Sequence, residues 1–237
     1  MPVLEERFDV VAQTALADWC SLVAYLLQPP TAEVIDQLQQ ASMGDDLRAI
    51  AFELRMTDEA TDKLAGDFDE LHRELASTPA KEALGTIRRE WTRVFVHPKA
   101  PIIWPYEGVF CDVERVHAGQ KSTESRLFIN PAATDAERRY KTAGYVDADM
   151  EYPADFIVTE LEFLAILHTQ LAQALTTNDA QAAEQIKASF DSFWQEHIVN
   201  WMPRFFERCQ EECHTTNYML AGRLGEQLIA AEQTIAR

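Results

Sequence analysis

The strongest constraint on the fold is the spacing of apolar residues, which follows a helical period. Between Glu5 and Leu27, apolar side chains recur three and four residues apart, as on the buried face of an α-helix. Similar segments follow along the chain, and none alternates apolar and polar residues as a half-buried strand would. We therefore predict an all-α fold, a single globular multi-helix domain over residues 1–237 with about ten helices.

Cap residues predict where several of these helices begin. Thr31 is expected to cap the second helix, and Thr78 to cap a helix that has Pro79 at its first position and runs to about Val96. Two helices near the C-terminus are expected at residues 200–213 and 216–235.

The middle of the chain offers further boundary signals. Thr134 and Glu137 have the spacing of a capping box, and Gly144 is placed to stop the helix that they begin. Pro153 is expected to open a long helix that ends near Leu175.

An irregular segment interrupts the helical pattern. The stretch "HPKAPIIWPYEGVFCDVE" begins at His97 and holds three prolines with bulky apolar residues between them. Proline removes a backbone donor and disfavours helix in the residue before it, so we expect a non-helical crossover through Pro105. Residues 118–133 look like a second loop, and any boundary between lobes is expected within residues 97–133.

The charge balance excludes some classes of partner. Acidic side chains number 39 against 21 basic ones, which gives a formal net charge of -18. Nucleic acids and anionic membranes require clustered Lys and Arg, so neither is an expected partner. A basic peptide would be attracted. No apolar run approaches the ~20 residues that span a bilayer, and the N-terminus lacks a signal-peptide pattern, so we expect no membrane insertion and a cytoplasmic location.

The negative charge is concentrated in the stretch "DADMEYPADFIVTELEFLAIL", which starts at residue 147 and carries six carboxylates. Asp155 is expected in the first turn of a helix, where a carboxylate stabilises exposed N–H groups. Glu160 has apolar neighbours one helical turn away in both directions. It is therefore expected to be hydrogen-bonded or to have a raised pKa, and an arginine such as Arg89 or Arg93 could pair with it.

Two further groups of residues have a functional and a structural interpretation. Trp104, Tyr106 and Phe110 either fill the core or line a groove that grips a peptide. Glu211 and His214, with Cys209 and Cys213 one turn apart, could form part of a metal site or a small-molecule enzyme. Buried free thiols are the simpler interpretation of the cysteines. For the chain as a whole we expect no enzyme, no metal and no cofactor.

Three segments together resemble one protein family. They are "EWTRVFVHPKAPIIWPYEGVF", "YKTAGYVDADMEYPADFIVTELEFLAIL" and "FWQEHIVNWMPRFFERCQEE". Their order and motifs are similar to those of the TorD/DmsD/NarJ chaperones. That resemblance implies an all-α cytoplasmic chaperone that is a monomer or a domain-swapped dimer. Such a protein binds the twin-arginine leader peptide, or the apo-form, of a molybdopterin oxidoreductase until its cofactor is inserted.

The resemblance also implies which residues contact the client. By position in the motifs, the peptide-binding residues are Trp104, Pro105, Tyr106, Glu107, Glu151, Asp155 and Glu160. Two positions depart from the family pattern. Phe156 replaces a frequent His, and Gly108 replaces a common Ser, which indicates a divergent branch.

Overall fold

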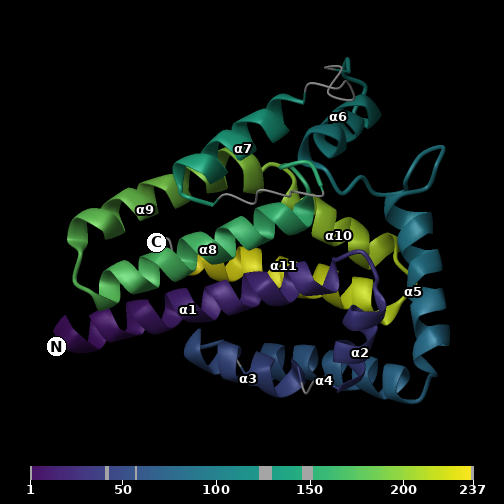
Figure 1. Cartoon of the computed structure of the whole chain (residues 1–237), viewed down its shortest axis with the longest axis horizontal. Helices are drawn as coiled ribbons and strands as arrows, with labels where there is room; N and C mark the ends of the chain where they lie inside the picture. Colours follow the sequence, from purple (N-terminus) through teal and green to yellow (C-terminus); the bar gives the residue numbers. More distant parts are fainter. Residues whose placement is uncertain (1, 41–42, 57, 123–129, 146–151, 236–237) are drawn as a thin grey trace. The chain divides into compact units, whose positions relative to one another are not determined.

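The fold is helical throughout the part of the chain that can be described. A computed structural model describes residues 2–40, 43–56, 58–122, 130–145 and 152–235. Within these ranges there are eleven α-helices, one π-helical turn and a single isolated bridge (Figure 1). The predicted all-α fold of about ten helices is therefore confirmed. The chain forms two compact units, residues 1–24 with 104–203 and residues 25–103 with 204–237.

The first unit holds the long helix α8 and the elements around it. Its elements are α1 (Pro2–Leu26, which ends in the second unit), α6 (Glu107–His117), α7 (Pro131–Thr142), α8 (Ile157–Thr176), α9 (Ala180–Phe193) and the π-helical turn η1 (Trp194–Ile198). In Figure 1, α8 and α9 lie side by side and run in opposite directions. Phe163 of α8 packs between Tyr140 and Phe193, with ring centroids 4.5 and 4.9 Å away, and this cluster buries the apolar faces of α7, α8 and α9.

The second unit is built around the neighbouring helices α3 and α4. Its elements are α2 (Ala32–Gln40), α3 (Met43–Glu53), α4 (Asp58–Ala76), α5 (Ala80–Phe95), α10 (Met202–Glu212, which begins in the first unit) and α11 (Thr216–Ile235). Helix α4 also packs against α2 and α11. Phe95 of α5 contacts Trp91 and Tyr218, with ring centroids 4.8 and 5.4 Å away. A buried aromatic cluster therefore joins α5 to α11.

Some helix ends follow the local sequence signals and others do not. The hydroxyl of Thr31 accepts a hydrogen bond from the backbone of Val34 at 3.2 Å, which confirms that cap. The prediction for Thr78 is wrong, because its hydroxyl donates to the carbonyl of Glu74 at 2.8 Å, and α5 begins at Ala80 without a side-chain cap. Gly144 lies just beyond the end of α7, as expected for a residue that stops the helix, and its φ is 77°.

The predicted starts of α7 and α8 are also wrong. The capping box at Thr134 is not used, because Asn130 caps α7 and accepts from Ala132 N at 3.0 Å. Helix α8 begins at Ile157 rather than Pro153. The backbone N–H of Phe156 instead donates to the Pro153 carbonyl at 3.0 Å, so a turn separates the proline from the helix.

The proline-rich crossover is non-helical between α5 and α6, as its composition predicts. The chain passes from the second unit to the first between Ile103 and Trp104. Backbone N–H of Ile103 donates to Val94 O at 3.0 Å, which ties the end of this segment to α5. Among the helices that the structure describes, none combines the length and the apolar character that a membrane-spanning segment needs.

Candidate functional site

Two segments far apart in the sequence meet at the predicted site. The backbone N–H of Glu107 donates to Asp155 O, and that of Ile157 donates to Pro105 O, both at 2.9 Å. Between these bonds, Tyr106 and Phe156 form an antiparallel bridge. Neither helix can supply these contacts alone, so the residues that precede α6 and α8 position one another.

This pairing brings most of the predicted site residues together, but it buries the acidic ones. Relative exposure is 7% for Glu107, 1% for Asp155 and 0% for Glu160. Pro105 is also buried, while Trp104 and Tyr106 are half-buried. Glu151 lies outside the described residues. The three carboxyl groups therefore lie beneath the surface that the aromatic residues reach.

The carboxylate of Asp155 stabilises α6 and not α8, the helix predicted for it. It lies two residues before the start of α8, so it is not in a first helical turn. Its Oδ2 accepts from the backbone N–H of Gly108 at 3.1 Å and from the side-chain amide of Asn130. Because Gly108 lies in the first turn of α6 and Asn130 caps α7, one carboxylate holds the starts of both helices.

The glycine at position 108 has a steric reason. A Cβ at this position would lie 2.3 Å from Oδ1 of Asn130. A serine, as expected at this position in the family motif, would displace the amide that bonds to Asp155. The departure from the motif is therefore coupled to the contact between Asn130 and Asp155.

Glu107 faces an imidazole that the sequence interpretation missed. Its Oε2 is 2.8 Å from Nδ1 of His197, and Nε2 of the same ring is 3.0 Å from Oδ2 of Asp135. Arg139 donates to Asp135 at 2.5 Å and to Glu196 at 2.6 Å. The imidazole of His197 thus lies between two carboxylates, those of the half-exposed Asp135 and the buried Glu107.

The turn that carries His197 is unusual. Residues Trp194 to Ile198 form the π-helical turn η1, a geometry found at many functional sites. No spacing in the sequence predicted it. The segment around His197 and Trp201 was part of the resemblance to the family, and this was the only signal that could have found the two residues.

Glu160 is satisfied on one oxygen only. The indole N–H of Trp201 donates to Oε2 at 3.1 Å, and Oε1 has no hydrogen-bond partner. The alternative of an arginine partner is wrong. Arg93 pairs with Glu90 in the second unit, and Arg89 donates to Thr86. The carboxyl group is hydrogen-bonded, but by an indole.

Burial raises the pKa of the carboxyl groups at this site. It raises the pKa of Glu160 well above its usual value, and the charges of Glu107 and Asp155 add to the effect. Burial likewise raises the pKa of Glu107 and of Asp155, against the opposing effect of their hydrogen bonds. Burial alone would lower the pKa of His197, but contacts with Glu107 and Asp135 outweigh it and raise the pKa. Carboxyl groups that remain partly protonated can share protons with one another and with the imidazole.

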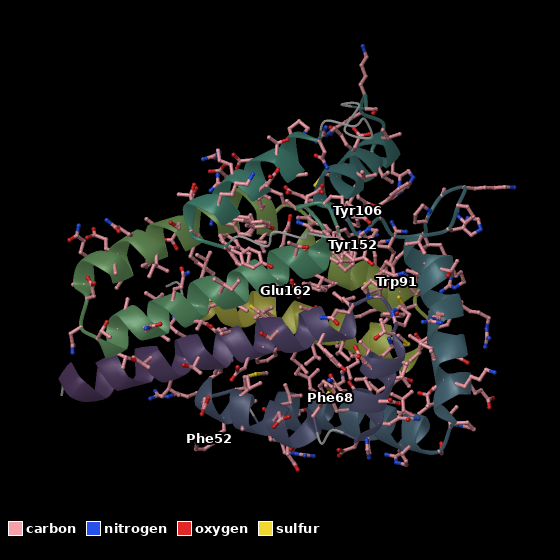
Figure 2. All side chains as sticks on the ribbon, viewed as in Figure 1. Phe52, Phe68, Trp91, Tyr106, Tyr152 and Glu162 are labelled. Carbon is pink, nitrogen blue, oxygen red and sulfur yellow. The ribbon has the colours of Figure 1, made fainter. Side chains whose placement is uncertain are left out.

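Aromatic rings cover the outer side of the same segments. Phe156 lies between Tyr106 and Tyr152, with ring centroids 5.5 and 4.7 Å away. The two tyrosines are half-buried and lie close together in Figure 2. Phe156 is itself buried, so it packs as an apolar residue and offers no imidazole beside Asp155.

The alternative metal site at the C-terminus is not assembled. Cys209 and Cys213 are buried, whereas Glu211 and His214 are exposed. Glu211 pairs with Arg204 at 3.4 Å, and burial raises the pKa of the Cys209 thiol well above its usual value. Within the described residues, the cluster of side chains that could hold a metal is instead Glu107, Glu160 and His197, whose ligand atoms lie within 4.8 Å of one another.

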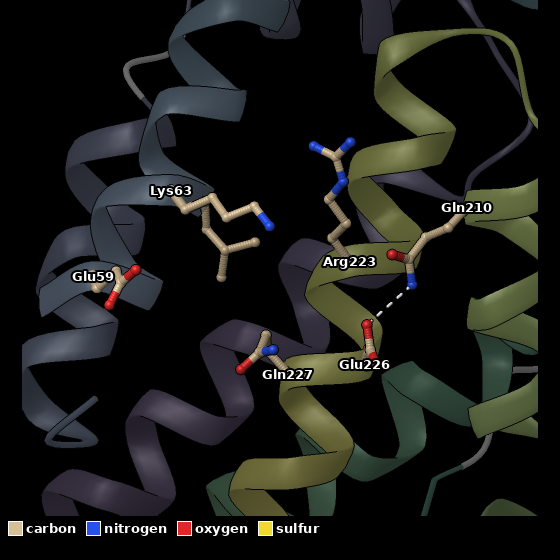
Figure 3. Close-up of a pocket in the computed structure, with 7 residues that line it drawn as sticks. Glu59, Lys63, Gln210, Arg223, Glu226 and Gln227 are labelled. Atoms are coloured by element: carbon tan, nitrogen blue, oxygen red, sulfur yellow. Dashed lines mark hydrogen bonds between the residues drawn. The ribbon is translucent and has the colours of Figure 1, made fainter. Parts of the chain in front are cut away.

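A separate hollow of about 340 Å³ lies in the second unit, between α4, α10 and α11 (Figure 3). Arg223 and Lys63 point into it from opposite sides. Arg223 pairs with Asp67 at 2.7 Å, and Gln210 donates to Glu226 at 3.2 Å. The charges that line it are of both signs, and it contains none of the predicted site residues.

Comparisons with known proteins point to one family. The model of the nitrate reductase delta subunit family matches residues 57–207. Similar relatives include the chaperone protein TorD of Vibrio parahaemolyticus, 26% identical over 37% of this chain, and that of Vibrio cholerae, 30% identical over 33%. The chlorate reductase assembly chaperone protein of Ideonella dechloratans is 40% identical over 33% of this chain.

Each of these three matches covers only part of this chain and only part of the relative. The chain spans 40%, 34% and 38% of the lengths of the three relatives, in the order given. No solved structure matches the chain. The matched residues 57–207 include both segments that form the site.

Proposed function

Because the chain belongs to the nitrate reductase delta subunit family, that of the TorD/DmsD/NarJ chaperones, we propose that it is a chaperone in the assembly of a molybdopterin oxidoreductase. It binds the leader peptide or the apo-form of the catalytic subunit. It holds this client until the cofactor is inserted, and it acts in the cytoplasm without catalysing a reaction. The observation that carries the proposal is the pairing of the Tyr106 and Phe156 segments, which gathers the family's motif residues at one place.

The proposed client site comprises Trp104, Pro105, Tyr106, Glu107, Glu151, Asp155 and Glu160, in two roles. The half-buried rings of Trp104 and Tyr106 contact the apolar part of the client, because aromatic side chains supply large contact area at low entropic cost. Asp155 fixes the backbone beneath these rings through Gly108, while Glu107 and Glu160 hold the side chains of His197 and Trp201. In this assignment Asp155 does not contact the client directly, since its carboxylate is buried.

Long-range attraction supplies the second part of recognition. A twin-arginine leader has two adjacent guanidinium groups followed by an apolar stretch. The net charge of -18 raises the local concentration of such a peptide and speeds its association. Apolar burial against the aromatic rings then supplies most of the affinity.

Calorimetric titration tests the proposal with a synthetic peptide that carries two adjacent arginines and an apolar stretch. We expect binding that weakens as ionic strength rises, because the Debye length falls from ~10 Å at 0.1 M to ~3 Å at 1 M salt. A matched peptide with the same apolar stretch and two glutamines should bind more weakly at low salt. Indistinguishable titrations for the two peptides would remove leader recognition from the proposal.

Size-exclusion chromatography separates the two expected assemblies, a monomer and a domain-swapped dimer. Titration of each separated form with the arginine peptide then identifies the form that binds. The client itself can be sought as the oxidoreductase subunit whose leader binds most tightly.

A further inference from the structure

We propose that Glu107, Glu160 and His197 form a binding site for a divalent transition-metal ion such as Zn²⁺. The ligand atoms of these three side chains lie within 4.8 Å of one another. They come from the start of α6, the first turn of α8 and the turn η1. A metal ion here would tie together three elements of the first unit, and the proposal rests on this geometry rather than on the chaperone function.

The imidazole is arranged as a metal ligand usually is. Metal-binding histidines donate their second ring N–H to a carboxylate, which fixes the tautomer and the ring plane. Nε2 of His197 is 3.0 Å from Oδ2 of Asp135. Asp135 in turn accepts from Arg138 and Arg139, which favours its ionised form as the acceptor. In the neutral imidazole, Nδ1 then carries the lone pair.

That lone pair faces a carboxylate oxygen. Nδ1 of His197 and Oε2 of Glu107 are 2.8 Å apart. Two ligand atoms of a tetrahedral zinc ion are about 3.3–3.6 Å apart, given bonds of ~2.0–2.2 Å. A lone pair and a carboxylate at this distance repel each other unless a proton or a cation lies between them. A metal ion that replaces the proton would move the two atoms apart by about 0.5–0.8 Å.

Glu160 offers a second carboxyl group, which lies close enough to Glu107 for the two to share either a proton or a metal ion. Its Oε1 is buried and has no hydrogen-bond partner, while Oε2 is held by the indole of Trp201. An unsatisfied carboxylate oxygen in the interior is costly, because burial removes the water that would otherwise solvate it. The indole fixes the orientation of the carboxyl group from one side and leaves the other oxygen available as a ligand.

A bound cation would also neutralise the charge of the buried region. Glu107 and Glu160 are both almost completely buried, and His197 is 4% exposed. Two carboxylates in such surroundings are stable only when paired, protonated or bound to a metal. Carboxylate oxygens with one imidazole suit Zn²⁺, Mn²⁺ or Fe²⁺. The class of ligand is therefore a borderline or hard divalent cation, and no thiolate takes part.

The first test measures the metal content of the full chain, purified without a metal-affinity step. We expect about one equivalent of metal per chain. After removal by a chelator, added Zn²⁺ should raise Tm by about 5–10 °C at a hundredfold excess over Kd. Absence of bound metal together with an unchanged Tm in Zn²⁺ would overturn the proposal and leave protons as the groups that neutralise the cluster.

Variants locate the site. Glu160→Gln and His197→Gln keep the size of the side chains and should abolish stoichiometric binding. Asp135→Asn should weaken it by about 10–100-fold, because Asp135 orients the imidazole without touching the metal. Glu211→Gln and His214→Gln are matched controls on an exposed surface and should bind like the parent. Undiminished binding in both Glu160→Gln and His197→Gln would place the metal elsewhere and refute the assignment.

X-ray absorption at the zinc edge tests the parent protein even if a variant fails to fold. We expect only oxygen and nitrogen neighbours, with the multiple scattering of an imidazole. Sulfur in the coordination sphere would contradict the proposal, because it would assign the metal to Cys209 and Cys213.

Discussion

The carboxylate of Asp155 accepts a hydrogen bond from the backbone N–H of Gly108 at 3.1 Å, so it stabilises α6 instead of α8, the helix that follows it in the sequence. The partners are 47 residues apart. A residue that local rules assign to one helix thus holds the start of another, and it does so directly beneath Tyr106.

Replacement of Asp155 should therefore affect stability and client binding together. Asp155→Ala removes the acceptor for Gly108 and for Asn130, and we expect a loss of about 1–3 kcal/mol in the free energy of unfolding. Asp155→Asn retains one acceptor oxygen and should cost less. Denaturant titration gives both values, with Thr159→Ala in α8 as the control. Equal stability of the alanine variant and the parent would show that the bond to Gly108 contributes little.

Gly108→Ala should be destabilising for a steric reason. The new Cβ would meet the side chain of Asn130 at 2.3 Å, and we expect a cost of about 1–3 kcal/mol, as for other overpacked sites. Asn130→Ser shortens the obstructing side chain and keeps a helix-capping residue, so the double variant should lose less than the sum of the single ones.

Gly66→Ala is the matched control for this substitution. No atom lies within 4 Å of a Cβ at Gly66 in α4, so alanine should stabilise that helix by about 0.5–1 kcal/mol.

Additive effects of Gly108→Ala and Asn130→Ser on the free energy of unfolding would contradict the proposed clash.

Acid should weaken the second unit through Glu90. Arg93 donates to both oxygens of Glu90 at 2.8 Å, and His214 N donates to it at 2.5 Å. The bonds from Arg93 lower the pKa of Glu90 below its usual 4.5. A carboxyl group whose pKa is lowered by folding stabilises the fold above its unfolded pKa. This contribution is lost as pH falls from 4.5 toward the lower folded value.

The measurement compares Tm against pH for the parent and for Glu90→Gln. At pH 7 the variant should be less stable by about 1.5–3 kcal/mol, the usual contribution of hydrogen bonds to charged groups. The difference should shrink as the pH falls below 4.5. Glu82→Gln, at an exposed position of the same helix, should follow the parent. A difference that is constant with pH would mean that Glu90 acts through packing and not through its charge.

Trp104 should report client binding by fluorescence. It is half-buried, whereas Trp19, Trp91, Trp194 and Trp201 are buried. A peptide that covers Trp104 should shift its emission, and Trp104→Phe should remove most of the change. Trp194→Phe is the control and should retain the change. Survival of the signal in Trp104→Phe would place the client on another surface.

The sequence predicted the helices better than their contacts. Helix α11 has the predicted bounds, Thr216–Ile235, because its periodic apolar face is a local property. Asn130 and Asp155 were harder to interpret, because a cap signal does not say which helix uses the side chain. The π-helical turn that orients His197 depends on packing in the folded unit, so its role could not be read from spacing.

The family resemblance assigned Glu107, Asp155 and Glu160 to a client site, which stays a prediction. The structure brings the three carboxyl groups together and buries them. The sequence suggested that an arginine such as Arg89 or Arg93 could pair with Glu160. Glu160 is instead held by an indole, because a fully buried carboxyl group can accept a hydrogen bond from any well-placed donor. The order of charges in a sequence does not determine which of them reach the solvent.

The division of the chain into two units, each made of separated stretches, has a consequence for its biosynthesis. The first unit has all of its residues once position 203 has been translated, whereas the second still lacks residues 204–237. At ~5–20 residues per second, helices α2 to α5 wait on the order of seconds for α11 to cover α4. During that interval the nascent chain exposes apolar helix faces of its own. The proposed chaperone is thus, until α11 is made, an incompletely folded protein with the same vulnerability as the clients it would protect.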